Sequence, residues 1–187
     1  MADDTLQLYT GGQAREVFED VLAAYVEVYS VPPYAGDPFF SPETARARID
    51  LAMDAPEFQV ITAHNRHDVI GFVYGATLPV DAPWWSQVSG QSDTLLRQDV
   101  EAGRVAWLRE LLVRDAWRGT GVGRRLHDEW VAQRSLDFGQ QWSALTCIPD
   151  NEPAHDAYLR WGYEIIGQIK HASESPIYDA MTRPIPR

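Results

Sequence analysis

The chain has 187 residues, 45% of them hydrophobic, and its 27 acidic and 16 basic side chains give a net charge of −11. This length suits one domain with a single core, and the acidic balance argues against a nucleic-acid partner. No segment of the sequence is long and apolar enough to span a bilayer, so no membrane partner is expected. The lone Cys147 cannot form an internal disulfide, and the sequence has no Cys/His cluster with the spacing of a metal site.

The beginning of the sequence gives an expectation about location. Met1-Ala2-Asp3-Asp4 is acidic, whereas a secretory signal begins with basic residues and continues with apolar ones. We therefore expect a cytoplasmic protein.

The first part of the sequence predicts a strand and two helices. Residues 6–10 form the predicted strand, and residues 15–29 place their apolar side chains on one helical face. Residues 31–40 are rich in proline and predict a loop. Ser41 then caps a second helix, with Pro42 at its first position.

The middle of the sequence predicts a hairpin followed by a long insertion. Residues 58–63 and 69–78 are rich in β-branched and aromatic residues and flank a polar turn. Residues 79–103 are longer than a simple connection and include a candidate helix over residues 92–100. This insertion favours a covered binding site, but it could equally form the contact of a homodimer.

The last part of the sequence alternates strands and helices. The periodicity and the turn residues predict a strand over 105–113, a helix over 122–138, a strand over 143–148, a helix over 153–161 closed by Gly162, and strands over 163–169 and 177–182.

A glycine loop joins the strand over 105–113 to the helix that follows. Its sequence is Arg118-Gly119-Thr120-Gly121-Val122-Gly123-Arg124-Arg125. Alternate glycines remove side chains where the backbone must approach a ligand, and the first amide groups of a helix attract an anion. A P-loop would need Lys and then Ser or Thr after the last glycine, and a dinucleotide-binding loop would need glycine at position 124. The loop therefore predicts a pyrophosphate site of another kind.

The spacing of Arg118, Gly121 and Gly123 is similar to Arg/Gln-x-x-Gly-x-Gly/Ala, the coenzyme A signature of the GNAT superfamily of N-acetyltransferases. A second block, Asn151-x-x-Ala154-x-x-x-Tyr158-x-x-x-Gly162-Tyr163, resembles the later half of the same fold. The resemblance thus covers roughly residues 105–169. It implies a mixed α/β fold with a central, mostly antiparallel sheet of six to seven strands that splays at its middle strands and carries helices on both faces. It also implies a single domain over residues 1–187, with an acceptor-side half (1–104) and a coenzyme A half (105–187).

The resemblance implies that acetyl-CoA is a cosubstrate, and the lack of a Cys/His cluster implies no bound metal. The backbone of the strand end would pair with the pantetheine arm, the amides of the glycine loop would hold the pyrophosphate, and a later asparagine would reach the coenzyme. These implied coenzyme residues are Leu111, Leu112, Val113, Arg118, Gly119, Thr120, Gly121, Val122, Gly123, Arg124 and Asn151.

Two residues are candidates for the proton transfers that aminolysis of a thioester requires. Tyr158 matches the tyrosine that the family places by the sulfur, where a phenol can protonate the departing thiolate; the alternative is a core tyrosine. Glu110 is the candidate base, although it could instead pair with Arg109 or with an arginine across the sheet, and many members of the family use a water relay. His155, one turn before Tyr158, is expected to be solvated or hydrogen-bonded and could assist.

Charge is divided unevenly along the sequence. Residues 1–104 carry 16 acidic and 6 basic side chains, a net charge of −10, whereas residues 105–187 carry 11 and 10, a net charge of −1. The acidic half would attract a cationic acceptor, although acidic residues also serve solubility. Aromatic residues in two loops of this half either wall the acceptor site or pack within their loops. They are Tyr34, Phe39, Phe40, Trp84 and Trp85.

The sequence thus predicts transfer of acetyl to a primary amine of a small cationic molecule by direct attack on the thioester. An amine metabolite, a polyamine or an aminoglycoside-like antibiotic would suit carboxylates and aromatic faces. The alternative acceptor is the N-terminal amine or a lysine of a protein or peptide, which would need an open groove. A third interpretation, a non-catalytic coenzyme-sensing module, is disfavoured by the retained motif residues.

Overall fold

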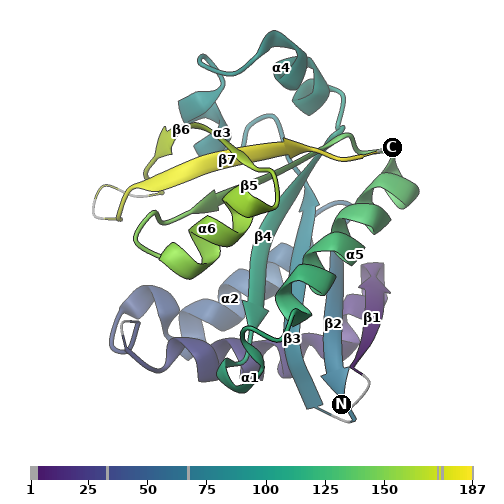
Figure 1. The fold of residues 1–187 in the computed structure, drawn as a ribbon, viewed down its shortest axis with the longest axis vertical. Coiled ribbons are helices and arrows are strands. Elements are labelled where there is room, and N and C mark those ends of the chain that lie inside the picture. The colour runs from purple at the N-terminus through teal and green to yellow at the C-terminus, as the bar shows by residue number, and fades with distance from the viewer. Residues whose placement is uncertain (1–3, 33, 67, 172, 174, 187) are drawn as a thin grey trace. The chain divides into compact units, whose positions relative to one another are not determined.

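The computed structural model describes residues 4–186 apart from 33, 67, 172 and 174 (Figure 1). The chain divides into two compact units, and each unit draws on separate stretches of sequence. The first unit holds the residues up to Ala76 together with Arg109–Trp130, and the second holds Thr77–Leu108 together with the residues from Val131 onward.

The described strands form a seven-stranded sheet in the order β1-β2-β3-β4-β5-β7-β6. They are β1 (Thr5–Thr10), β2 (Gln59–Asn65), β3 (Asp68–Thr77), β4 (Val105–Val113), β5 (Trp142–Cys147), β6 (Glu164–Ile169) and β7 (Tyr178–Pro184). Antiparallel pairing joins β1 to β2, β2 to β3, β5 to β7 and β6 to β7, whereas β4 pairs in parallel with β5 over residues 105–107. The predicted mixed fold with a mostly antiparallel sheet is confirmed.

Helices connect these strands. The described α-helices are α1 (Phe18–Tyr29), α2 (Pro42–Met53), α3 (Pro83–Val88), α4 (Thr94–Glu101), α5 (Val122–Phe138) and α6 (Glu152–Arg160). Short 3-10 helices are η1 (Gly11–Val17), η2 (Pro38–Phe40) and η3 (Asp115–Trp117).

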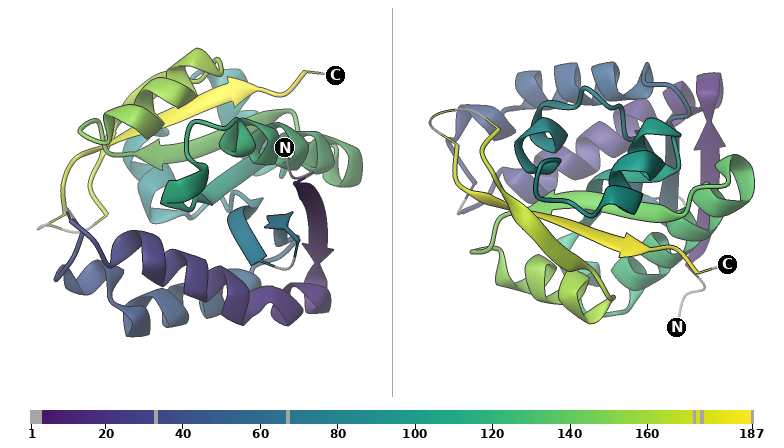
Figure 2. Two further views of the ribbon diagram at one scale, coloured as in Figure 1. Left: turned by 60° about the horizontal axis from the view of Figure 1, so that its bottom comes forward. Right: turned by 90° about the horizontal axis from the view of Figure 1, so that it is seen from above.

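In the first unit, α1 and α2 cover one face of β2 and β3 (Figure 1 and Figure 2). Buried apolar side chains from all four elements form one core, which includes Val21, Ile49, Val60 and Phe72. Burial of such side chains is the main favourable contribution to folding, about 1.5–3 kcal/mol for each. The apolar face predicted for the first helix is therefore the face that packs on the sheet.

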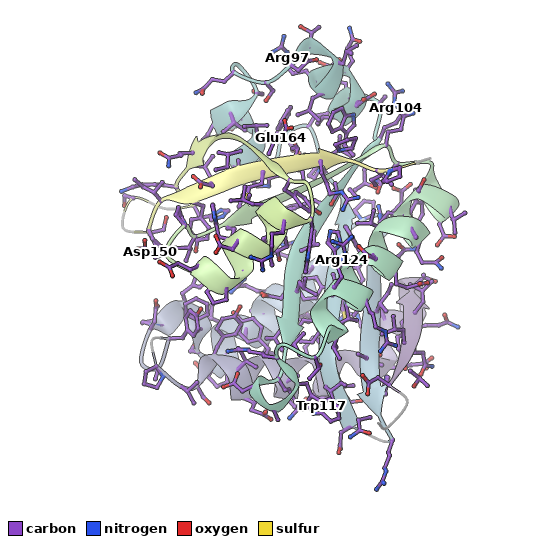
Figure 3. All side chains as sticks on the ribbon, viewed as in Figure 1. Arg97, Arg104, Trp117, Arg124, Asp150 and Glu164 are labelled. Atoms are coloured by element: carbon purple, nitrogen blue, oxygen red, sulfur yellow. The ribbon has the colours of Figure 1, made fainter. Side chains whose placement is uncertain are left out.

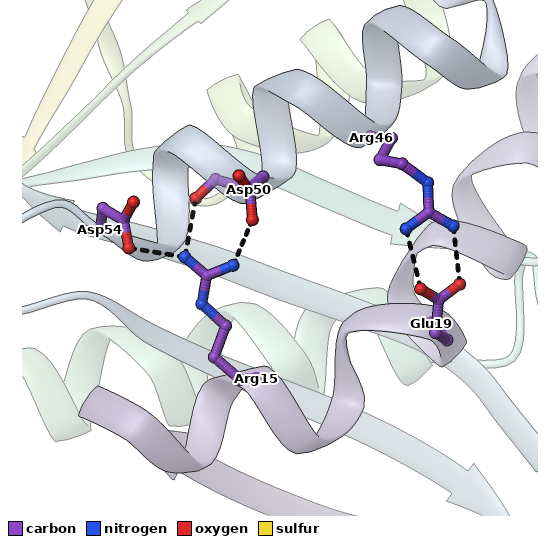
Figure 4. Close-up of polar contacts among 5 residues, drawn as sticks. All are labelled: Arg15, Glu19, Arg46, Asp50 and Asp54. Atoms are coloured by element: carbon purple, nitrogen blue, oxygen red, sulfur yellow. Dashed lines mark hydrogen bonds and ion pairs between the residues drawn. The ribbon is translucent and has the colours of Figure 1, made fainter.

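Exposed ion pairs tie η1 and α1 to α2 (Figure 4). Arg46 donates to both carboxylate oxygens of Glu19, at 2.8 and 2.9 Å. Arg15 contacts Asp50 and also donates to Asp54 at 2.6 Å. Because these side chains are exposed, each pair contributes only about 0–1 kcal/mol.

At Gly71, β3 and the end of β4 approach each other closely. A Cβ atom at this position would lie 2.8 Å from the carbonyl oxygen of Leu112, closer than side chains come to backbone. Just beyond, the amide of Arg114 donates to the carbonyl oxygen of Ile70 at 2.9 Å. Glycine at position 71 therefore allows β3 to support the strand end that leads into the glycine loop.

In the second unit, α6 and the insertion helix α3 lie on opposite faces of β5, β7 and β6 (Figure 2). Both insertion helices bury apolar side chains in the core of this unit, among them Trp84 and Val88 of α3 and Leu96 and Val100 of α4. The insertion over residues 79–103 is thus largely packed structure.

The edge strand β6 contacts α3 through one close packing contact and a pair of hydrogen bonds. The backbone of Gly167 packs against the Val88 side chain, and a Cβ atom at Gly167 would lie 2.7 Å from Cγ1 of Val88. The side-chain amide of Gln87 donates to the carbonyl oxygen of Lys170 at 2.9 Å and accepts from its amide at 3.1 Å. Gln87 therefore satisfies both backbone polar groups of the residue that follows β6.

Most predicted bounds agree with the structure. Ser41 caps α2 by accepting from the amide of Thr44 at 3.2 Å. The helix predicted over residues 15–29 begins instead as η1, because Gly11 and Gly12 favour a tight turn over a regular helix. Residue 33 of the predicted loop and residue 67 of the predicted turn lie outside the described residues.

No helix in the described part of the chain combines the length and the apolar character needed to cross a membrane.

Candidate functional site

In the first unit, the end of β4 leads through η3 into an exposed glycine loop. Residues 118–121 are exposed, and Gly119 and Gly121 have φ angles of +73° and +90°, which residues with a side chain rarely adopt. Gly123 differs, because a Cβ atom there would make an ordinary contact, 3.5 Å, with Cγ2 of Val113. The loop backbone is therefore accessible immediately before α5 begins at Val122.

The arginines of this loop lie in exposed pairs with nearby acids. Arg118 pairs with Asp115 at 2.9 Å and donates from Nε to the carbonyl oxygen of Val113 at 3.2 Å. Arg124, labelled in Figure 3 at the start of α5, donates to Asp128 one turn later at 2.5 Å. Exposed pairs of this kind are weak and exchange readily for a stronger anion.

Glu110 lies on β4 and is partly buried. The Tyr29 hydroxyl donates to its Oε1 atom at 3.0 Å, across a separation of 81 residues in sequence. Burial raises the pKa of Glu110 to about 7, although the Arg48 guanidinium and the Tyr29 hydrogen bond both act to lower it. Glu110 is therefore hydrogen-bonded to a tyrosine of α1, and its ionised form is stabilised by the charge of an arginine of α2.

Two tyrosines near this carboxylate, Tyr29 and Tyr74, have raised pKa values. The pKa of Tyr29 is raised well above its usual value, first by burial and then by the charge of Glu110. Burial and the same charge also raise the pKa of Tyr74, on β3. Tyr25 accepts a hydrogen bond from Arg48 at 3.0 Å. The phenols of Tyr29 and Tyr74 remain protonated near neutral pH, whereas the pKa of Glu110 lies in that range.

Sequence reasoning missed this cluster. It treated Tyr25 and Tyr29 as apolar positions of a helix and gave Arg48 and Tyr74 no role. Two tyrosines one turn apart on a buried helical face were an available signal, because a buried hydroxyl needs a polar partner.

The predicted aromatic residues of the first loop gather around Tyr29. Its ring stacks on Phe40 at 4.7 Å and meets Tyr34 edge-on at 4.9 Å. Phe39 packs against Phe40 at 5.0 Å, and the guanidinium of Arg48 lies 4.2 Å from the centre of the Phe39 ring. Tyr34, Phe40 and Tyr29 also line a cavity of about 310 Å³.

In the second unit, Tyr158 projects from α6 and is 8% exposed. Its ring meets those of Trp161 and Tyr163 edge-on, at 5.6 and 5.5 Å. Asn151 occupies the cap position of α6, yet its side chain makes no capping hydrogen bond. An asparagine at this position usually caps the helix, so its amide is available for another partner.

His155 was expected to be solvated or hydrogen-bonded, and the structure shows that it is hydrogen-bonded. Its Nε2 atom donates to Oδ2 of Asp179 at 2.8 Å, and Gln168 donates to Oδ1 of the same carboxylate at 3.0 Å. Cys147, opposite Asp179 in the β5–β7 register, is buried, and its pKa is raised to about 12 by burial and by that carboxylate. Such a thiol is a poor nucleophile at neutral pH.

Trp84 and Trp85 were predicted either to wall an acceptor site or to pack within their loop. They are 1% and 5% exposed on α3 and belong to the core of the second unit. Trp84 also lies 6.0 Å from the ring of Trp107 on β4. This burial favours the packing interpretation for both tryptophans.

The structure groups the predicted site residues differently from the division at residue 104. The first unit holds Glu110, the strand end at Leu111, Leu112 and Val113, residues 118–124, and the aromatic residues Tyr34, Phe39 and Phe40. The second unit holds Asn151, Tyr158, Trp84 and Trp85. Each unit thus contains part of the predicted acceptor side and part of the predicted coenzyme side.

Solved structures of similar fold include several acetyltransferases. Arabidopsis thaliana NAA60 in complex with acetyl-CoA has a TM-score of 0.66 at 15% identity, over 97% of this chain and 99% of that one. An aminoglycoside 6'-acetyltransferase type Ii has a TM-score of 0.64 at 16% identity, over 98% and 99% of the two chains. Spermidine N-acetyltransferase from Vibrio cholerae, in complex with CoA and spermine, has a TM-score of 0.59 at 12% identity, over 99% and 97%.

Sequence comparison assigns the family. A search of curated proteins finds no match. A sequence model of the acetyltransferase (GNAT) family, however, matches residues 18–163, which include β2, β3, β4, the glycine loop, Asn151 and Tyr158. The chain therefore belongs to the GNAT family of acetyltransferases.

Proposed function

We propose that this chain transfers an acetyl group from acetyl-CoA to the primary amine of a small cationic molecule. Family membership supports the transfer, and two similar structures hold acetyl-CoA or CoA. The observation that carries the proposal is the partly exposed Glu110 carboxylate with a pKa of about 7. A general base works best when its pKa lies near the operating pH.

The proposed coenzyme contacts come from both units. In the first unit, the backbone of residues 111–113 would bind the pantetheine arm, and the amides of residues 118–124 would bind the pyrophosphate. The exposure of this loop and the positive φ angles of Gly119 and Gly121 support that role. In the second unit, the uncommitted side-chain amide of Asn151 would provide a further polar contact.

The proposed reaction moves two protons. The acceptor nitrogen, in its neutral amine form, forms a bond to the thioester carbonyl carbon, and the carbon–sulfur bond then breaks. Glu110 accepts the proton that the amine loses, and Tyr158 gives its phenolic proton to the departing thiolate. Proton exchange with solvent returns both groups to their starting state.

Charge supports a cationic acceptor. Residues 1–104 carry a net charge of −10, and Glu110 adds a carboxylate at the proposed base position. The similar structures include an aminoglycoside acetyltransferase and a spermidine acetyltransferase, whose named substrates are cations. We further propose that residues 1–187 act as one acetyltransferase domain.

Thiol release from acetyl-CoA tests this function. The purified protein would be assayed with monoamines, polyamines, aminoglycosides, amino acids and basic peptides. We expect turnover with small cationic amines. Turnover with peptides alone would contradict a small-molecule acceptor, and coenzyme binding without thiol release from any amine would contradict the transfer reaction.

The acid assignment is tested by Tyr158→Phe. This change should lower kcat by about 100-fold, because a positioned proton donor contributes at least that factor, and should leave the Kd for coenzyme A unchanged. Tyr163→Phe is a matched control, since Tyr163 is a neighbouring buried tyrosine whose hydroxyl contacts Ser143 at 2.6 Å. Full turnover by Tyr158→Phe would show that the assignment is wrong.

The pyrophosphate assignment is tested by Gly121→Asp. The added carboxylate should repel the phosphates and abolish acetyl-CoA binding in calorimetry. Gly139→Asp controls for backbone strain, because Gly139 also has a positive φ angle, +64°, and also has open space around its Cβ position. Normal coenzyme binding by Gly121→Asp would overturn the assignment.

A further inference from the structure

A cavity of about 310 Å³ lies beside the connection between α1 and α2 in the first unit. Its wall is mostly apolar, with the rings of Tyr29, Tyr34 and Phe40 and the proline Pro38. It has one carboxylate, Asp37, whose Oδ1 atom already accepts from the amide of Phe39 at 2.9 Å. This volume suits a ligand with one small ring or a short alkyl chain.

The aromatic wall is held in a fixed arrangement by its own contacts. The ring centres of Tyr29, Tyr34 and Phe40 are mutually separated by 4.7 to 4.9 Å. Aromatic pairs at such distances contribute about 0.5–1.5 kcal/mol beyond the area that they bury. A ligand would therefore meet a preorganised surface and would lose little free energy in ordering it.

Tyr29 joins this cavity to the proposed base. Its side chain lines the cavity, and its hydroxyl donates to Glu110 Oε1 at 3.0 Å. A molecule packed against Tyr29 thus contacts the residue that donates a hydrogen bond to the Glu110 carboxylate. An ammonium group in this position would gain from the negative charge of Glu110 and from the faces of the aromatic rings.

We infer that this cavity holds the carbon body of the acceptor, and that the acceptor is a compact primary monoamine with an aromatic or alkyl body. This inference rests on the proposed acetyl transfer and narrows its substrate class. A polyhydroxylated aminoglycoside or a polyamine would lose hydration of its extra polar groups against the apolar part of the wall. The polar side chains of the wall, Ser30, Asp37 and Ser41, already make hydrogen bonds within the chain. An aromatic or alkyl body loses no hydrogen bonds there.

A cavity-filling variant tests the inference. Ala35 lines the cavity and is exposed, so Ala35→Trp can fill the space without disturbing a core. The control is Ala23→Trp, which places the same side chain at an exposed position of α1. Each variant and the wild-type protein would be assayed by thiol release with 2-phenylethylamine, spermidine and kanamycin. Calorimetry would measure binding of coenzyme A and of 2-phenylethylamine.

We expect 2-phenylethylamine to have the highest kcat/KM of the three amines and to lose at least about tenfold of it in Ala35→Trp through a higher KM. Ala23→Trp should match the wild type, and all three proteins should bind coenzyme A equally. Turnover of spermidine or kanamycin but not 2-phenylethylamine, or turnover that Ala35→Trp leaves unchanged, would overturn the inference and leave acetyl transfer standing. Binding of 2-phenylethylamine without thiol release from any amine would instead identify acetyl transfer as the part that failed.

Discussion

Each unit contains a carboxylate in a polar cluster, but the two carboxylates are held in different ways. In the second unit, Asp179 is 5% exposed, and both of its oxygens accept hydrogen bonds, from Gln168 and His155. In the first unit, Glu110 is partly exposed and has one hydrogen-bond donor among the described residues, Tyr29. A fully bonded carboxylate fixes its neighbours, whereas one with an uncommitted oxygen can exchange a proton.

This contrast explains how the same functional group serves structure in one place and, as we propose, chemistry in another. Burial without enough donors raises the pKa of Glu110 to about 7. Tyr29 and Tyr74 have raised pKa values and do not compete for the proton near neutral pH. A proton acceptor that works near pH 7 can thus be built from one strand glutamate and the phenols that pack around it.

The largest expected effect comes from Glu110→Gln. This change keeps the shape and a hydrogen-bond acceptor for Tyr29 but removes the proton acceptor, so kcat/KM for the amine should fall by about 100-fold or more. Thiol release at pH 8 measures it, with coenzyme A affinity as the control. A variant with wild-type kcat/KM would show that Glu110 is not the base and would favour a water relay.

The pH dependence should sharpen the contrast. Since the base must be ionised, kcat/KM of the wild type should rise with pH and level off above the pKa of Glu110, about 7. This inflection should be absent from the residual activity of Glu110→Gln. An identical inflection in the variant would assign the titration to another group.

The stability of the protein should respond in the opposite direction. The raised pKa means that the folded state holds the proton more tightly, so this stabilisation is complete below the usual pKa of glutamate and is lost as pH rises through about 7. Relative to Glu110→Gln, the wild type should lose at most about 3 kcal/mol of unfolding free energy between acidic and mildly alkaline pH. Urea unfolding at several pH values measures this difference.

Asp179→Asn should affect stability and spare the chemistry. The variant weakens two buried hydrogen bonds, and we expect a loss of about 1–3 kcal/mol in unfolding free energy. Urea denaturation measures the loss. The pH profile of thiol release should keep its inflection near 7, and a shifted profile would show that Asp179 also influences the reaction.

The smallest effects are expected at the glycines of the loop. Gly121→Ala places a side chain at a φ angle of +90° and should cost about 1 kcal/mol in stability, with weaker acetyl-CoA binding. Gly123→Ala makes an ordinary contact with Val113 and should be close to neutral. Equal effects at both positions would contradict the distinct roles of the two glycines.

Much of the fold could be predicted because local signals were strong. The bounds of β4 and α5 agree with the prediction because an apolar run ends in a glycine loop and a periodic helix follows. Ser41 and Pro42 marked the start of α2 because capping depends on neighbouring residues alone. Glu110, too, could be singled out from its position before the loop.

The partners of Glu110 could not be predicted, because Tyr29 is 81 residues away and Arg48 lies on another helix. Such contacts depend on how whole elements pack. The sequence left two alternatives open for Trp84 and Trp85 for the same reason, since the packing of an insertion depends on the core that receives it. Sequence therefore indicated the proposed base more readily than its environment.

The contact between Gln87 and Lys170 has a consequence for solubility. A sheet edge offers unpaired backbone groups on which the strand of another molecule can assemble, and proteins protect such edges to avoid aggregation. The Gln87 amide occupies the donor and the acceptor of the residue after β6, as a neighbouring strand would, while Val88 lies against Gly167. The insertion thus makes the backbone groups of Lys170 unavailable to a strand of another molecule.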